Sequence, residues 1–439
     1  MKIWTDRRYP IILSCAKCLA PWVEDEVRSL GYTPIDKTEN MVVVEGAMRD
    51  VFKLNLRLRT AHRVLVPLLR ARCRHIRELY DLVTTIDWEN LIADDDYFSV
   101  SSIVYNDTIR DTRLPSLKTK DAIADRIRSK CGRRPDSGPD YDRGVAVFLH
   151  WERDRMIIYL DTSGAPLSKR GYRKIPGSAP MQETLAAACI DALHWDRKTP
   201  FLSPMCGSGT PAIEAALAAI NRAPGSLRAH FGFMSIKGYK QIIPGTTAPR
   251  SAPRQRFGVT PEQIWKDMVL EAAEQEKKED LPPIIATDIS PEAIENAKSN
   301  AYAAGVHNYI TFKACDFGDT PIPPSNTTEP FISFSKTGKE GYKARGCVFF
   351  NPEYGIRLGD PAELAPIYER IGTFMNEKCQ GYTGGVLTGS PELSKMINLF
   401  YVTRFPFYNG PIDCRLFVFP GCEIKGEQLS TQLSPVVDK

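Results

Sequence analysis

Strands and helices alternate through the second half of the sequence, and this alternation limits the possible folds more than any other feature. The predicted helices and strands follow one another at residues 182–194, 201–202, 212–220, 284–286, 291–304, 347–350 and 385–387. Alternating elements of this kind fold into a parallel sheet that helices cover on both faces. The second half is therefore predicted to be a doubly wound α/β domain.

The first part of the chain has a different pattern, that of small α+β units. Strands are expected at 11–15, 41–45, 64–69, 97–104, 145–149 and 156–160, and helices at 19–30, 50–61 and 118–130. The apolar residues of the first helix recur at helical spacing, and Gly31 ends it. Because the longer strand–helix–strand rhythm is missing here, a separate N-terminal architecture is predicted.

Composition is that of a folded protein in a reducing compartment. Hydrophobic residues make up 43% of the 439 residues and charged residues 25%, as in globular domains. No stretch approaches the roughly 18 consecutive apolar residues of a membrane span, and the first residues lack a secretory signal. The eleven cysteines are odd in number and scattered, which favours free thiols. We therefore expect a cytoplasmic protein without membrane association.

Two arginine-rich segments, residues 57–77 and 110–134, stand out against a formal net charge of only +4. Charge runs commonly form solvated surface. The planar guanidinium of arginine, however, also suits bidentate contacts with phosphate, and basic patches supply the salt-sensitive part of nucleic-acid affinity. A nucleic-acid partner is therefore favoured only in combination with the motifs that follow.

A glycine-rich motif, Ser203-Pro204-Met205-Cys206-Gly207-Ser208-Gly209-Thr210, follows an apolar strand and opens an alanine-rich helix. Glycines let the backbone approach a ligand, and the helix N-terminus offers unpaired N–H groups. The motif also satisfies a dinucleotide-binding pattern, but that pattern needs an acid about 20 residues further on. Residues 221–240 contain none, which disfavours an NAD(P) site.

Polar residues end three further predicted strands: Asp288, Asp316 and Asn351. Taken singly, Asp288 also fits a helix N-cap and Asp316 a turn. The carboxyl ends of strands in an open α/β sheet share one crevice, however. The glycine motif and these three residues, in order at four strand ends, therefore predict a single site.

With these motifs the sequence resembles the THUMP-domain RNA methyltransferases, specifically the bacterial group that methylates the exocyclic amine of guanine in large-subunit ribosomal RNA. The resemblance covers nearly the whole chain. It includes residues 54–65, the junction 167–173, Asn351-Pro352-x-Tyr354-Gly355, and Tyr408-Asn409-Gly410, the expected turn between two closing antiparallel strands.

The resemblance implies three units. These are a ferredoxin-like unit at 1–60, a THUMP RNA-binding domain at 61–163, and a Rossmann-like class I methyltransferase domain with a mostly parallel seven-stranded sheet at 164–439. Large-subunit ribosomal RNA is the implied partner. The implied RNA contacts, drawn from the basic segments and the junction, are Arg110, Arg113, Lys118, Lys120, Arg126, Lys169, Arg170 and Arg173.

The resemblance also implies S-adenosylmethionine as the methyl donor. The implied donor-binding residues are Pro204, Cys206, Gly207, Ser208, Gly209, Thr210, Asp288, Ile289, Asp316, Phe317 and Asn351. Among them Asp288 would bind the ribose hydroxyls and Asp316 the adenine amine. No set of histidines and cysteines supplies four zinc ligands, since Cys15 and Cys18 have no second pair, so no metal is expected.

The implied catalytic residues are Asn351, Pro352 and Tyr354. In the family's pattern the Asn351 side chain and the Pro352 carbonyl accept hydrogen bonds from the target amine, and Tyr354 stacks on the extruded base. A guanine amine is a poor nucleophile because its lone pair is delocalised into the ring, and acceptors localise that lone pair toward the methyl group. Positioning can then carry most of the rate.

Two departures from the family keep other functions open. The family usually has aspartate at the position of Ser203 and a second proline at that of Glu353. One alternative is a non-catalytic RNA-binding or ribosome-assembly protein. Another is a DNA amine methyltransferase, since the Asn-Pro-x-Tyr motif also serves adenine and cytosine amines.

Two proline-rich segments, 243–257 and 320–343, are predicted to be long loops.

Overall fold

The computed structural model describes residues 4–106, 109–111, 113–140, 143–174, 181–241, 259–324, 344–354 and 361–420. Three features of the sequence analysis lie outside these residues: Gly355, all of segment 243–257 and most of segment 320–343.

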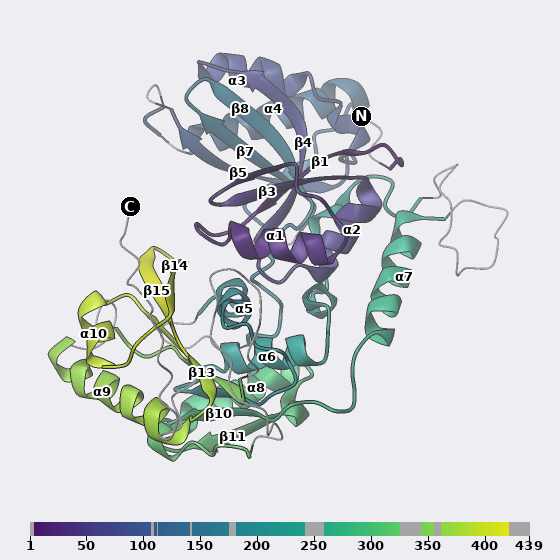
Figure 1. The fold of residues 1–439 in the computed structure, drawn as a ribbon. Helices are drawn as coiled ribbons and strands as arrows, with labels where there is room; N and C mark the ends of the chain where they lie inside the picture. Colours follow the sequence, from purple (N-terminus) through teal and green to yellow (C-terminus); the bar gives the residue numbers. More distant parts are fainter. Residues whose placement is uncertain are drawn as a thin grey trace.

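A mixed eight-stranded sheet forms the N-terminal part of the molecule, in the order β2-β3-β1-β4-β8-β7-β5-β6 (Figure 1). Its strands are β1 (Tyr9–Ser14), β2 (Asp36–Thr38), β3 (Met41–Gly46), β4 (Arg63–Arg72), β5 (Tyr97–Tyr105), β6 (Asp136–Ser137), β7 (Val145–Glu152) and β8 (Arg155–Asp161). The long strand β4 pairs with β1 on one side and with β8 on the other. The expected ferredoxin-like and THUMP units therefore share one continuous sheet.

Four helices pack on this sheet: α1 (Ala20–Ser29), α2 (Met48–Arg57), α3 (Ile76–Thr84) and α4 (Leu114–Cys131). The helix expected at 19–30 is α1, which buries Ala20, Val23 and Val27 on one face. The expected basic helix is α4, and it ends at Gly132, whose φ of 83° suits a glycine. The pattern analysis did not predict α3, which lies at the end of the first arginine-rich segment.

The second sheet has the seven strands and the mostly parallel order that were predicted, β11-β10-β9-β12-β13-β15-β14. Its strands are β9 (Phe201–Pro204), β10 (Ile284–Asp288), β11 (Ile310–Ala314), β12 (Gly346–Phe350), β13 (Tyr382–Thr388), β14 (Thr403–Asn409) and β15 (Ile412–Phe419). The first five run parallel, and β15 runs antiparallel to both β13 and β14. Gly410, at a φ of 64°, lies in the expected turn between β14 and β15.

Helices cover both faces of this sheet: α5 (Glu183–Ala192), α6 (Thr210–Ala219), α8 (Pro291–Ala303), α9 (Pro361–Lys378) and α10 (Pro391–Met396). Helix α7 (Pro261–Glu274) instead packs beside α2, where Trp265 contacts Phe52 and Phe233. Strand β12 shows why its sequence is a continuous apolar run. Cys347 and Phe349 belong to one hydrophobic cluster, whereas Val348 and Phe350 belong to another. Successive side chains point to opposite faces, so a sheet buried on both sides needs apolar residues at every position.

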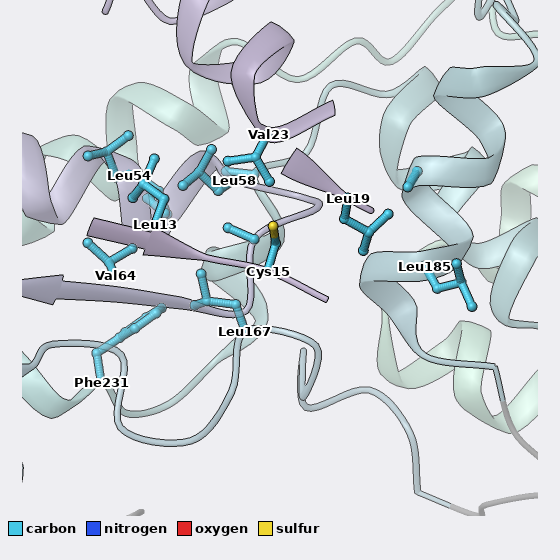
Figure 2. Packing of buried hydrophobic residues seen from close by; sticks show 14 of the residues in the cluster. Leu13, Cys15, Leu19, Val23, Leu54, Leu58, Val64, Leu167, Leu185 and Phe231 are labelled. Carbon is cyan, nitrogen blue, oxygen red and sulfur yellow. The ribbon is translucent and has the colours of Figure 1, made fainter. Parts of the chain in front are cut away.

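One hydrophobic cluster runs from the N-terminal sheet into the second domain. Figure 2 shows Leu13 and Leu19 from the N-terminal part together with Leu167, Leu185 and Phe231 from the rest of the chain. Burying apolar surface in this way contributes about 25 cal/mol for each Å² removed from water. The two sheets are therefore joined by a shared core.

No helix in the described part of the chain is long and apolar enough to cross a bilayer.

A buried asparagine explains part of the motif at residues 54–65. Asn55 Nδ2 donates to Val51 O and to Thr162 Oγ1, both at 3.0 Å, and its Oδ1 accepts from Ser163 Oγ at 2.7 Å. The side chain is fully buried and joins α2 to the segment after β8.

Asn55→Ala should lower the free energy of unfolding by about 2–3 kcal/mol, because it removes three buried hydrogen bonds and leaves the Ser163 hydroxyl without its acceptor. Urea unfolding followed by circular dichroism measures the change. The exposed Arg49→Ala variant on the same helix should stay within about 0.5 kcal/mol of the unmodified protein. Equal losses in both variants would contradict this account of Asn55.

Candidate active site

The four strand ends named by the sequence meet at one cavity of about 440 Å³. Its wall is built by the residues Met181, Ser203, Met205, Cys206, Gly207, Ser208, Thr210, Pro211, Asp288, Ile289, Asp316, Phe317, Asn351, Pro352, Glu353, Tyr354, Leu364, Ile367 and Arg370. It lies at the carboxyl ends of β9, β10, β11 and β12, where open α/β sheets bind ligands.

The two glycines of the motif have different roles. Gly207 has a φ of 53°, and a Cβ added to it would meet no atom within 4 Å, so its backbone faces open space in the cavity wall. Gly209 has a φ of 84°, and an added Cβ would lie 2.9 Å from Ala297 Cβ of α8. Gly207 thus allows a ligand to approach, whereas Gly209 allows two helices to pack closely.

Asp288 holds the glycine loop and the start of the next helix at once. Its Oδ2 accepts from Gly207 N at 2.9 Å, and its Oδ1 accepts from Ser290 N at 3.0 Å. Ser290 caps α8 through its own hydroxyl, which accepts from Ala293 N. The following residue, Ile289, is 74% exposed. A carboxylate at this rim is well placed to accept hydrogen bonds from the hydroxyls of a bound sugar.

Asp316 is paired with a residue that the sequence analysis did not identify, Arg370 of α9. Asp316 Oδ1 accepts from Gly318 N at 2.8 Å and from Arg370 Nη2. Partial burial acts to raise the pKa of Asp316, but the hydrogen bonds from Gly318 and Arg370 outweigh it and lower that pKa. The Arg370 guanidinium also lies 4.7 Å from the centre of the Phe317 ring.

The Asn351 side chain carries an acceptor without a partner. Among the described residues, Asn351 Oδ1 is buried and makes no hydrogen bond. Leaving a buried acceptor unpaired costs about 1–3 kcal/mol, which a donor group brought by a ligand can recover. The backbone beside it is fixed, because Tyr368 Oη donates to Glu353 O at 3.0 Å.

Tyr354 lies in the wall of the same cavity and is partly buried between the two hydrophobic clusters. Its hydroxyl oxygen accepts from Asn409 Nδ2 of β14 at 3.0 Å. The sequence analysis placed Asn409 in a hairpin turn and did not predict this contact.

The structure does not place every expected donor-binding residue at the cavity. Pro204 and Gly209 are buried and are not part of its wall. Conversely, Met181 and the α9 residues Leu364, Ile367 and Arg370 were missed. No local sequence motif marks these residues, and the helix that carries the last three, α9, was not predicted.

Arg170 requires a correction, since it cannot be a surface contact for RNA. It is 1% exposed, its Nη1 donates to Leu167 O and its Nη2 to Arg59 O, and its Nε lies 3.5 Å from Glu214 Oε1. Arg173 is also engaged inside the domain, where it donates to Glu183, Met181 O and Thr210. Both arginines therefore join the junction at residues 167–173 to neighbouring helices of the second domain.

The other basic residues proposed to contact RNA lie closer to solvent. Arg110, Arg113 and Lys169 are exposed, whereas Lys118 and Lys120 on α4 are half-buried. Arg126 is only 18% exposed at its side chain and pairs with Asp87 and Glu89. It is therefore a poor candidate for a phosphate contact.

No group of three or more histidine, cysteine, aspartate or glutamate side chains in the described ranges is arranged to hold a metal ion.

The strand order and the position of the cavity define a class I methyltransferase domain. Residues 170–417 match the family model described as the RMKL-like methyltransferase domain, and the chain belongs to that family. Residues 10–65 match the RlmL ferredoxin-like domain and residues 73–161 match the THUMP domain. The family suggested by the sequence motifs is thereby confirmed.

Curated relatives extend the match across both parts of the chain. A protein of Pseudomonas putida strain W619 named ribosomal RNA large subunit methyltransferase K/L is 30% identical over 97% of this chain and 54% of its own length. A protein of Psychromonas ingrahamii with the same name is 32% identical over 97% of this chain and 51% of its own length. The chain thus spans about half the length of these relatives.

Solved structures share the fold. A protein of Listeria monocytogenes described as a predicted N6-adenine-specific DNA methylase is 28% identical, with a TM-score of 0.75 over 94% of this chain and 97% of that one. A structure determined as a complex with SAH and described as that of a methyltransferase is 24% identical, with a TM-score of 0.76 over 96% of this chain and 100% of that one.

Cys206 should react slowly with iodoacetamide. Burial, with a smaller contribution from the nearby Asp288 carboxylate, raises the pKa of its thiol, so little thiolate forms at pH 8. Peptide mass spectrometry should show labelling of Cys206 at least about tenfold slower than that of the exposed Cys131. After unfolding in urea both should react. Equal labelling in the folded protein would contradict the burial of Cys206.

Proposed function

We propose that the protein transfers a methyl group from S-adenosylmethionine to the exocyclic N2 amine of a guanosine in large-subunit ribosomal RNA, in the cytoplasm. The single observation that carries this proposal is the buried, unpartnered Asn351 Oδ1 in the wall of the cavity that also holds Asp288 and the glycine loop. An acceptor in that place suits an amine donor.

The cavity residues fit the donor. Asp288 would bind the ribose hydroxyls, and the open backbone at Gly207 gives room for the methionine part. At Asp316 the hydrogen bonds from Gly318 and Arg370 both reach Oδ1, which leaves Oδ2 for the adenine amine, and Phe317 lies beside it. The bound donor supplies an electrophilic methyl group on its sulfonium.

The chain's own residues would activate the target amine by orienting it. Asn351 Oδ1 and the Pro352 carbonyl accept the two amine hydrogens, which draws the nitrogen toward tetrahedral geometry and directs its lone pair at the methyl group. Holding two reactants in line can supply about 7–11 kcal/mol of the barrier. As the N–C bond would form, the methyl–sulfur bond would break, S-adenosylhomocysteine would leave, and the methylated nitrogen would lose a proton to water. A strong base is then unnecessary, because the nitrogen becomes acidic once it is methylated.

The two departures from the family pattern leave this arrangement intact. Ser203 is 1% exposed on β9, in the cavity wall. Glu353 has an exposed side chain, while its backbone carbonyl is held by Tyr368. The Asn351-Pro352 backbone is therefore fixed by contacts that do not require a second proline, which favours an active enzyme over a non-catalytic RNA-binding protein.

A DNA amine methyltransferase is the second candidate. The observation that favours it is the description of the Listeria monocytogenes neighbour as a predicted DNA methylase. The THUMP match argues for RNA. Competition between ribosomal RNA and duplex DNA for the labelled methyl group decides between the two substrates.

Asn351→Ala should lower methyl transfer to unmodified large-subunit RNA by at least about a hundredfold, because a hydrogen bond made to the reacting group in the transition state is lost. Donor affinity, measured by calorimetry, should change less than about threefold. Asn308→Ala, the same substitution at an exposed position, is the matched control and should retain full activity.

Two results would contradict the proposal. The first is no methylated product from the unmodified protein together with no donor binding, which would indicate a non-catalytic protein. The second is an Asn351→Ala variant that transfers methyl groups at the full rate.

Lys118→Gln and Lys120→Gln should each weaken RNA binding and reduce its dependence on salt, because each removes one phosphate contact. Fluorescence anisotropy at salt concentrations from about 50 to about 200 mM measures both the RNA affinity and its dependence on salt. Arg126→Gln, whose guanidinium is already paired with Asp87 and Glu89, should keep the original salt dependence. A change in all three variants would place the RNA contact elsewhere.

A further inference from the structure

Asn409 contacts the catalytic loop from a strand that forms no part of the cavity wall. Its Nδ2 donates to Tyr354 Oη at 3.0 Å, and the residue is only 4% exposed. Asn409 is the last residue of β14 and lies 55 positions after Tyr354 in the chain. A hydrogen bond from a buried donor fixes the ring of Tyr354 more tightly than packing alone.

Alternate residues of β14 connect this contact to the N-terminal part of the molecule. Phe405, Phe407 and Asn409 are two positions apart in the strand, so their side chains share one face. Trp22 of α1 packs against Phe405 and Phe407, with ring centroids 5.4 and 4.8 Å apart. The helix that covers the N-terminal sheet thus covers the same strand face from which Asn409 reaches Tyr354.

A second contact between the N-terminal part and the hairpin of β14 and β15 lies at the residue before Asn409. The Lys17 ammonium lies 5.4 Å from the centre of the Tyr408 ring, a cation–π distance. Tyr408 precedes Asn409 directly. The position of the hairpin end is therefore set jointly by the N-terminal part and by the second sheet.

We propose that Asn409 is a positioning residue that fixes the Tyr354 ring for stacking on the target base, and that packing of α1 on β14 makes this position depend on the N-terminal part. The inference rests on the proposed function, because it gives Asn409 a part in the same methyl transfer. Asn409 acts through Tyr354 and makes no contact with the reacting atoms.

A double-mutant cycle tests the proposal. Asn409→Ala and Tyr354→Phe should each lower kcat by about tenfold while donor affinity stays within about twofold. The double variant should be no slower than Tyr354→Phe alone, because Tyr354→Phe already removes the bond to Asn409, together with the hydroxyl's contact with Cys414. Asp413→Asn, an exposed position on the other strand of the hairpin, is the control and should keep the original kcat.

Conservative rescue separates positioning from a general loss of structure. In Asn409→Asp the carboxylate can accept from the Tyr354 hydroxyl, so this variant should recover most of the lost kcat. Three results would overturn the proposal: multiplied losses in the double variant, an unchanged kcat in Asn409→Ala, or a tenfold loss of donor affinity in that variant.

A structural measurement keeps this inference separate from the proposed function. If the unmodified protein transfers no methyl group, the proposed function fails. Crystal structures of the unmodified protein and of Asn409→Ala then decide the positioning claim. A displaced Tyr354 ring in the variant supports it, and an unmoved ring overturns it.

Discussion

The hydrogen bond from Gly207 N to Asp288 Oδ2 joins two strand ends that are 81 positions apart in the chain. It fixes the glycine loop against the end of β10, and the same carboxylate holds Ser290 N at the start of α8. The wall of the cavity depends on this contact, because it holds the loop at Gly207, whose other side faces open space. The parallel pairing of β9 with β10 and β12 then brings Asn351 to the same rim.

The N-terminal part and the methyltransferase domain form one packed unit. They share a hydrophobic core, and Trp22 contacts the strand that carries Asn409. Arg170, which was expected at the surface, is buried between the two parts of the chain, where it donates a hydrogen bond to Arg59 O. Under the proposed function, a base delivered by the N-terminal part would meet residues 351–354, whose position that part helps to set through β14.

The sequence predicted the four strands whose ends line the cavity, and the residues at those ends, because their signals are local: an apolar run followed by a polar residue. It did not predict the short edge strands β2 and β6. It did not predict α9, whose pattern is interrupted by Pro366, nor Arg370, which that helix carries. Buried Arg170 resembles any surface arginine in sequence, since its partners Arg59 and Glu214 lie far away in the chain. The bond between Asn409 and Tyr354 was missed for the same reason, because only the folded sheet brings the two together.

A crystal structure of the protein with S-adenosylhomocysteine tests the central claim most directly. The account predicts ribose hydroxyls on the Asp288 carboxylate, the adenine amine at Asp316, and the sulfur atom facing Asn351 Oδ1. Density for the ligand anywhere else, with this cavity left unchanged, would contradict the shared site at the strand ends.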